Sequence, residues 1–232
     1  MAHHKHHGAD KVITASVAAV SADMNVTPRY KGMSMFIAPK GAGFTVSRKL
    51  EKLGYKGIDS AELIFDDFRL PGFNLIGGEG NGMKAAIAGL ELGRVNVAAR
   101  GVGVAQAALD EAVRYAQTRR TFGKPIAEHQ AIALKLGDMA TRVEAARLLT
   151  EKAAAVLERG ERADYEAGMA KLFATEAALE NATEAMRIHG GYGYSKEYDM
   201  ERHYRDARIT EIYEGTSEIQ RMVIARQELG LR

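Results

Sequence analysis

The chain of 232 residues is 46% apolar, and its 32 Lys and Arg are almost balanced by 30 Asp and Glu. This composition suffices for a sizeable core and gives no basic excess that would favour nucleic acid as a partner. No run reaches the roughly 20 apolar residues of a membrane-spanning helix, and the start lacks the basic-then-apolar order of a signal peptide. Without cysteine there is no disulfide, thiolate metal site or thiol nucleophile, so we expect a soluble, cytoplasmic protein.

The first nine residues hold four of the seven histidines, at His3, His4, His6 and His7. Imidazoles this close together could bind a metal ion. A terminal histidine cluster is also typical of an expression tag or a disordered tail. We favour a tag or a disordered tail for residues 1–9, expect no metal, and begin the fold at Asp10.

The next part of the chain, to about residue 73, has the texture of short strands. Turn residues separate four runs rich in β-branched and aromatic residues, at 12–17, 33–37, 44–46 and 62–65. Such spacing favours antiparallel pairing. Because four short strands bury little core by themselves, we expect residues 10–77 to form only part of a β-domain.

After the glycine-rich turn at 77–82 the texture changes to long helical periods. We expect helices over 83–117, from about 132 to Gly160, over 163–188, and from after Thr216 to about 229. Apolar residues of the second helix recur at spacings of three and four, which places them on one face, and the first helix is rich in small residues that allow close helix approach. The predicted fold is therefore mainly α with a small β part: a partial antiparallel β-domain followed by a C-terminal four-helix bundle over 78–232.

The connection between the first two long helices reads Arg-Arg-Thr-Phe-Gly-Lys-Pro-Ile at 119–126, with Gln130 shortly after. Two guanidiniums, a hydroxyl and a helix N-terminus suit a phosphate or pyrophosphate, because arginine pairs bidentately and the helix end supplies N–H donors. The alternative is a charged turn between helices with no ligand.

A second motif, Arg-Ile-His-Gly-Gly-Tyr-Gly-Tyr at 187–194, ends the third helix. Closely spaced glycines permit a backbone to approach a ligand and to adopt positive φ values. A helix C-cap followed by a loop explains them equally well. The motif matches neither a P-loop nor a dinucleotide fingerprint, since no strand precedes it.

The third motif, Tyr-Glu-Gly-Thr-Ser-Glu-Ile-Gln-Arg at 213–221, precedes and opens the last helix. Ser217 and Gln220 have the spacing of a capping box, so Glu214 is expected on a short turn outside the helix. That position suits a catalytic base. The alternative is an anion stabilised by the dipole of the following helix.

Together with Ala-Glu-Leu-Ile-Phe-Asp-Asp at 61–67, these motifs resemble the acyl-CoA dehydrogenase family in order and spacing, from about Asp10 to Arg232. The resemblance implies flavin adenine dinucleotide (FAD) between a β-domain and the helical bundle. It also implies a homotetramer, a dimer of dimers whose subunits share flavin contacts. In such an enzyme Glu214 would remove the α-proton of an acyl-CoA while hydride passes to flavin N5, giving a trans-2-enoyl-CoA. Electrons would continue to an electron-transferring flavoprotein.

The resemblance assigns roles to further residues. Those that match flavin contacts are Arg119, Thr121, Phe122, Gln130, Arg187, Gly190, Gly191, Thr216 and Glu218. Those that match the acyl-CoA site are Arg94, Tyr213, Gly215 and Arg226. For Arg94 and Arg226, ion pairs that brace the bundle are an equal explanation. Some family members carry the base immediately before Arg94, but glycine occupies that position here, so the resemblance assigns the base to Glu214.

Compared with the family pattern, the chain lacks the N-terminal helical domain and the first part of the β-domain, which supply other flavin and acyl-CoA contacts. It also has no tryptophan. Two hypotheses follow: a flavin-dependent dehydrogenase whose other part is supplied elsewhere, or a helical assembly module without turnover. The sequence leaves the length of the acyl chain open.

Overall fold

A computed structural model of the protein describes residues 17–23 and 25–231. The histidine cluster and nearly all of the strand predicted at 12–17 lie outside these residues. The chain divides into two compact units. One comprises Met1–Glu51 and Ile58–Gly89, and the other comprises Lys52–Gly57 and Leu90–Arg232.

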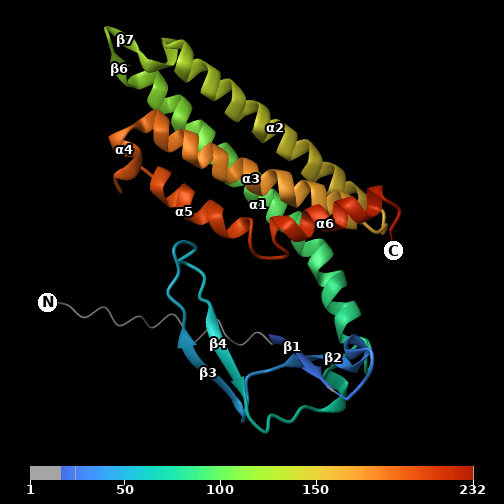
Figure 1. The fold of residues 1–232 in the computed structure, drawn as a ribbon. Coiled ribbons are helices and arrows are strands. Elements are labelled where there is room, and N and C mark those ends of the chain that lie inside the picture. The colour runs from blue at the N-terminus through green and yellow to red at the C-terminus, as the bar shows by residue number, and fades with distance from the viewer. Residues whose placement is uncertain (1–16, 24, 232) are drawn as a thin grey trace, which may run out of the picture. The chain divides into compact units, whose positions relative to one another are not determined.

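The first unit contains two small antiparallel sheets. Its strands are β1 (Val17–Ala22), β2 (Met33–Ala38), β3 (Phe44–Lys49), β4 (Ala61–Phe65) and β5 (Leu75–Ile76). One sheet has the order β1-β2-β5, and the other pairs β3 with β4 (Figure 1). The strands predicted at 33–37, 44–46 and 62–65 are thus confirmed, because alternating apolar residues between turns gave a clear signal.

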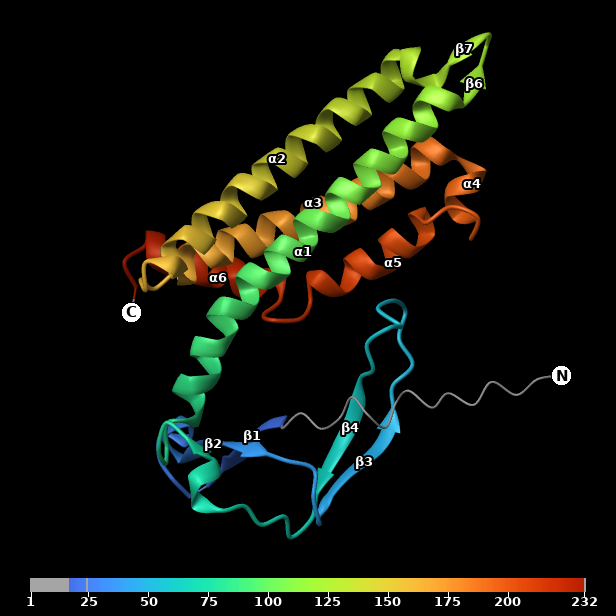
Figure 2. The ribbon, with the colours of Figure 1, turned by 180° about the vertical axis from the view of Figure 1, so that it is seen from behind.

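The second unit is a helical bundle with one short hairpin. Its elements are α1 (Gly82–Thr118), β6 (Arg120–Thr121), β7 (Lys124–Pro125), α2 (Gln130–Glu158), α3 (Asp164–His189), α4 (Gly191–Tyr194), α5 (Met200–Thr210) and α6 (Ser217–Glu228). The first turns of α1 belong to the first unit. Figures 1 and 2 show α1, α2 and α3 side by side along the bundle. No helix among the described residues combines the length and apolar character needed to cross a membrane.

Most of the described residues lie in helices and a small share in antiparallel strands, so the predicted fold class is confirmed. The four long helices were predicted nearly to their ends, but α4 and α5 were not predicted. Most residues of α5 are charged or polar, and its buried face consists of Met200, Ala207 and Thr210, too few apolar positions for a periodic signal. Both α5 and α6 pack against α3.

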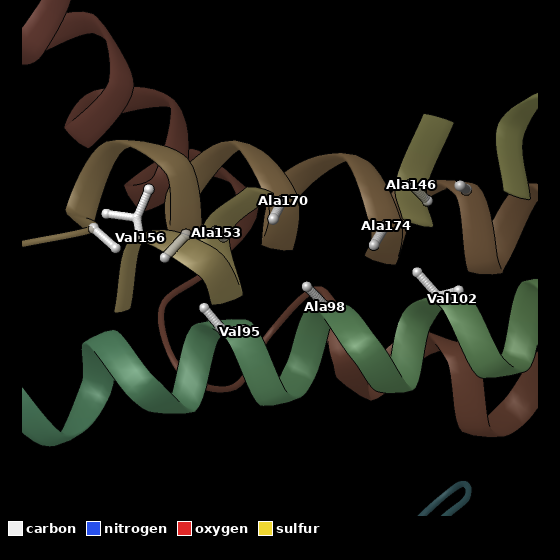
Figure 3. Close-up of a cluster of buried hydrophobic side chains, with 11 residues drawn as sticks. Val95, Ala98, Val102, Ala146, Ala153, Val156, Ala170 and Ala174 are labelled. Carbon is white, nitrogen blue, oxygen red and sulfur yellow. The ribbon is translucent and has the colours of Figure 1, made fainter. Parts of the chain in front are cut away.

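Small side chains fill the core between the three long helices. Figure 3 shows Val95, Ala98 and Val102 of α1 facing α2 and α3, which contribute Ala146, Ala153, Val156, Ala170 and Ala174. Alanine lets backbones approach closely. At Gly101 even a methyl group would not fit, because a Cβ built there would lie 2.7 Å from the carbonyl oxygen of Ala174.

One buried amide ties the three helices together. Asn181 of α3 is fully buried, and its Nδ2 donates to the carbonyl oxygens of Ala105 in α1, at 3.3 Å, and Met139 in α2, at 3.1 Å. These two hydrogen bonds favour one arrangement of the helices, while Oδ1 of Asn181 is buried without a partner among the described residues. The bundle is therefore a defined frame for the turns at its ends.

Candidate active site

Glu214 lies on the turn between α5 and α6, in a backbone conformation that residues other than glycine rarely adopt. Its φ is +56°, and Gly215 follows with a φ of +96°. A left-handed backbone at a residue other than glycine is uncommon, and it persists only where the surroundings hold it. The half-buried carboxylate of Glu214 is therefore presented by a turn that other residues keep in place.

The carboxylate rests against the bare backbone of α1. A Cβ built on Gly93 would lie 2.4 Å from Oε2 of Glu214 and 2.8 Å from its Cδ. Such distances lie far inside van der Waals contact, so the missing side chain at Gly93 leaves the room that the carboxylate takes.

Two fully buried side chains hold the carbonyl groups of this turn. Lys171 of α3 donates from Nζ to the carbonyl oxygens of Glu211, at 3.1 Å, and Gly215, at 2.7 Å. Gln220 of α6 donates from Nε2 to Gly215, at 3.0 Å, and more weakly to Glu214, at 3.4 Å. Burial lowers the pKa of Lys171 to about 8, although nearby carboxylates oppose the shift.

The predicted capping box is wrong in its details. The N-cap of α6 is Thr216, whose hydroxyl accepts from the N–H of Ile219 at 3.5 Å, while Ser217 is the first residue of the helix. Gln220 turns back to the Glu214 turn instead of capping. The pattern alone does not distinguish these arrangements, because Thr216 and Ser217 are both good N-cap residues.

The predicted acyl-CoA residues lie in different surroundings. Arg94 is buried and pairs with Asp164 of α3 at 3.4 Å, as expected of a residue that braces the bundle. The Tyr213 hydroxyl accepts from Arg100 at 3.3 Å, and Arg226 is exposed on α6.

The segment Lys52–Gly57 belongs to the helical unit and lies beside Tyr213. The N–H of Tyr55 donates to Asp206 of α5 at 2.6 Å, and the Tyr55 and Tyr213 rings meet edge to face at 6.4 Å. Burial raises the pKa of Tyr55, and the neighbouring hydroxyl of Tyr213 adds to this shift. Sequence reasoning missed this contact because the two tyrosines are far apart along the chain.

The first two motifs meet at one cavity of about 560 Å³. Its lining residues are Tyr115, Arg119, Thr121, Ile126, Ile188, His189, Gly190, Gly191, Tyr192 and Ser195. A volume of this size accommodates a nucleotide. The structure therefore brings Arg119 and Thr121 together with Gly190 and Gly191, as one phosphate-binding or nucleotide-binding site requires.

A buried histidine is among the residues that line this cavity. His189 shares a hydrogen bond of 2.8 Å between Nδ1 and the carbonyl oxygen of Ala185, and its ring stacks on Tyr115 at 4.2 Å. Its Nε2 is buried and has no partner among the described residues. Burial lowers the pKa of His189, which favours the neutral ring. A buried nitrogen without a partner is costly and suits a ligand that supplies the missing hydrogen bond.

The other predicted flavin residues do not line this cavity. Phe122 stands at the tip of the β6–β7 hairpin, 97% exposed with a φ of +51°. Gln130 is exposed at the first turn of α2, and Arg187 is exposed and paired with Glu184. Thr216 and Glu218 line a separate cavity of about 210 Å³. The described residues contain no cluster of three or more His, Asp or Glu side chains that could hold a metal ion.

The chain is similar to known proteins over most of its length. The family model described as "Acyl-CoA dehydrogenase, C-terminal domain" matches residues 80–229. The chain belongs to the acyl-CoA dehydrogenase family. An acyl-CoA dehydrogenase of Bacillus subtilis (strain 168) is 52% identical over 200 residues, which cover 86% of this chain and 53% of that protein. The mitochondrial short-chain specific acyl-CoA dehydrogenase of Bos taurus is 50% identical over 212 residues, covering 91% of this chain and 52% of that protein.

Solved acyl-CoA dehydrogenase structures have the same fold. Butyryl-CoA dehydrogenase from Megasphaera elsdenii superposes with a TM-score of 0.90 at 42% identity, covering 93% of this chain and 56% of that one. The chain thus spans about half the length of the relatives it matches. Within this chain, the predicted motifs form two groups: the Glu214 turn, and the cavity between the hairpin and the end of α3.

Proposed function

We propose that this chain provides the catalytic base and part of the flavin site of an acyl-CoA dehydrogenase, which converts an acyl-CoA to a trans-2-enoyl-CoA. The observation that carries the proposal is the carboxylate of Glu214, held on a left-handed turn against Gly93. A carboxylate on a fixed turn and only half exposed is suited to a single proton transfer. The motifs and the family membership support the same reaction.

In the proposed reaction Glu214 takes the proton from the α-carbon. The electron pair of the broken C–H bond forms the Cα=Cβ double bond as the β-hydrogen leaves with its own pair. FAD, when bound, supplies the acceptor for that hydride. The thioester carbonyl must be polarised while charge develops on it. Within the described part of the chain the N–H of Glu214 has no acceptor, so it is free to donate to that carbonyl.

Two groups of residues would hold FAD. Arg119, Thr121, Gly190 and Gly191 line the cavity of about 560 Å³ and fit the pyrophosphate and adenosine part, with Phe122, Gln130 and Arg187 around it. Thr216 and Glu218 follow the base and would contact the flavin end. We propose that the two groups serve flavins of neighbouring subunits in a homotetramer, which explains why the chain keeps them apart.

We further propose a short, straight acyl group as substrate, bound near Tyr213 and Gly215, with Arg94 and Arg226 bracing the surrounding helices. Support comes from relatives near half identity whose names specify short-chain or butyryl substrates. An electron-transferring flavoprotein would reoxidise the reduced flavin.

Visible absorption of the purified chain tests the proposal. With added FAD we expect bound flavin, and anaerobic butanoyl-CoA should bleach it faster than octanoyl-CoA does. Bleaching by both at equal rates would contradict the short-chain preference. If no flavin binds at any concentration, the chain is an assembly module and the dehydrogenase proposal fails for it.

Gly93→Ala should lower turnover without lowering the stability of the fold. Alanine favours the helix by up to about 1 kcal/mol, and the three atoms nearest to the new methyl group all belong to the movable end of Glu214. The fold should be as stable or more stable, while displacement of the carboxylate lowers turnover by about 100-fold. Gly103→Ala on the same helix, where a Cβ meets nothing within 4 Å, is the control for both thermal unfolding and turnover. Equal turnover in the two variants would show that the base does not depend on this space.

A further inference from the structure

Lys171 is a charged residue on the face of α3 that otherwise buries small side chains. Its neighbours on that face include Ala167, Ala170, Ala174 and Ala178, all buried, and its own exposure is 0%. No carboxylate among the described residues lies within ion-pair distance of Nζ. Burying an ammonium costs several kcal/mol unless polar groups compensate, and an apolar side chain of the same length would fill this space at lower cost.

The acceptors of Lys171 lie on both sides of Glu214. The carbonyl oxygens of Glu211 and Gly215 mark the two ends of the turn, and both accept from the one ammonium. Gln220 secures the same end at Gly215. Between these anchors Glu214 keeps a φ of +56°, which an unrestrained chain would leave for the ordinary helical or extended regions.

We propose that Lys171 is a positioning residue whose buried positive charge clamps the carbonyl groups on either side of Glu214 and so fixes the direction of that carboxylate. The role in turnover rests on the proposed function. The clamp itself does not.

The charge of Lys171 is set by groups on three elements. Burial in the helical core lowers its pKa to about 8, Arg94 of α1 adds to this shift, and Glu211, Glu214 and Glu218 oppose it. The ammonium is therefore mostly charged at neutral pH and loses its proton in the mildly alkaline range. The neutral amine is a weaker donor to carbonyl groups than the ammonium, so the clamp should loosen in that range.

Two equilibria involving Lys171 should respond to pH in opposite directions. Global unfolding hydrates the side chain and restores its ordinary, higher pKa, so the unfolded chain binds more protons and stability rises as the pH passes about 8. Release of the turn alone leaves the side chain buried without its acceptors. Charged Lys171 opposes that release, so the turn should open more readily above this pH.

Amide hydrogen exchange tests the clamp without any need for turnover. In the unaltered chain the turn amides, including the N–H of Ser217 that donates to Glu211, should lose protection by roughly tenfold between one pH unit below and one above 8, after correction for intrinsic exchange. Denaturant unfolding at the same two values should show equal or higher global stability. Unchanged turn protection across this range would overturn the proposal.

Variants at Lys171 provide a second test of the clamp by hydrogen exchange. Lys171→Met should lose turn protection at both pH values, and Lys171→Arg should retain it at both, because the guanidinium does not titrate there. Lys152→Met, on the exposed surface of α2, is the control and should behave as the unaltered chain. A Met variant with full turn protection would also overturn the proposal.

Turnover adds a readout that a purely structural role would not change. In a chain that oxidises butanoyl-CoA, Lys171→Met should lower kcat by about 100-fold with KM nearly unchanged, and Lys171→Arg should restore most of the rate. If KM instead rose by as large a factor as kcat fell, the positioning role would be overturned. If every variant and the parent are inactive, the dehydrogenase proposal fails while the exchange data still decide the clamp.

Discussion

Replacement of Glu214 by glutamine is expected to lower the turnover of an acyl-CoA by about 10²- to 10⁴-fold and to leave the fold unchanged. Glutamine has the same shape and fits the space beside Gly93, so the turn keeps its conformation. Its amide cannot accept the α-proton at neutral pH. The expected variant therefore binds FAD and acyl-CoA but does not reduce the flavin.

Rapid mixing of the flavin-loaded chain with butanoyl-CoA under anaerobic conditions measures this loss directly. Glu158→Gln, at the exposed end of α2, makes the same chemical change away from the turn and should bleach at the parent rate. Reduction by Glu214→Gln within about tenfold of the parent would place the base on another residue.

The second large effect is expected in stability, at Gly101. A methyl group there would lie 2.7 Å from the Ala174 carbonyl oxygen and 2.8 Å from its carbon, and these are backbone atoms that cannot rotate away. We expect Gly101→Ala to separate α1 from α3 and to lower the free energy of unfolding by about 1–3 kcal/mol.

Gly103→Ala is the matched control, two residues later on the same helix. Its methyl group meets nothing within 4 Å, so the ordinary preference of a helix for alanine should raise stability by up to about 1 kcal/mol. Urea unfolding followed by circular dichroism compares the pair. Equal stabilities would mean that α1 and α3 do not approach as closely as described.

The sequence predicted the parts of the fold that depend on local pattern. Long helices and strands can be predicted from the spacing of their apolar residues. The bounds of α1, α2 and α3 were therefore predicted nearly to their ends. The helix α5 was missed because its buried face is only three residues among charged ones. The cap of α6 was misassigned because adjacent threonine and serine carry the same signal.

The site was predictable only where its residues are contiguous. The motifs at 119–126, 187–194 and 213–221 are local, and family resemblance gave them roles that remain proposals. The anchors Lys171 and Gln220 depend on how α3 and α6 pack, which no motif encodes. A lysine among buried alanines was the available signal, and its spacing from Ala167 and Ala174 on one helical face would have marked it as an unusual core residue. The division of the proposed flavin residues into two groups also required the three-dimensional arrangement.

The alanine-lined core limits where this protein can change. An alanine has no side-chain rotamers to lose on folding and none to adjust afterwards, so Ala98, Ala170 and Ala174 cannot reorient to absorb a larger neighbour. New volume in the bundle must move whole helices, and with them the frame that supports Lys171. Directed evolution toward longer or branched acyl groups should therefore gather its accepted substitutions in the turns, at positions such as Tyr55 and Tyr213, and leave the interior of the bundle almost untouched.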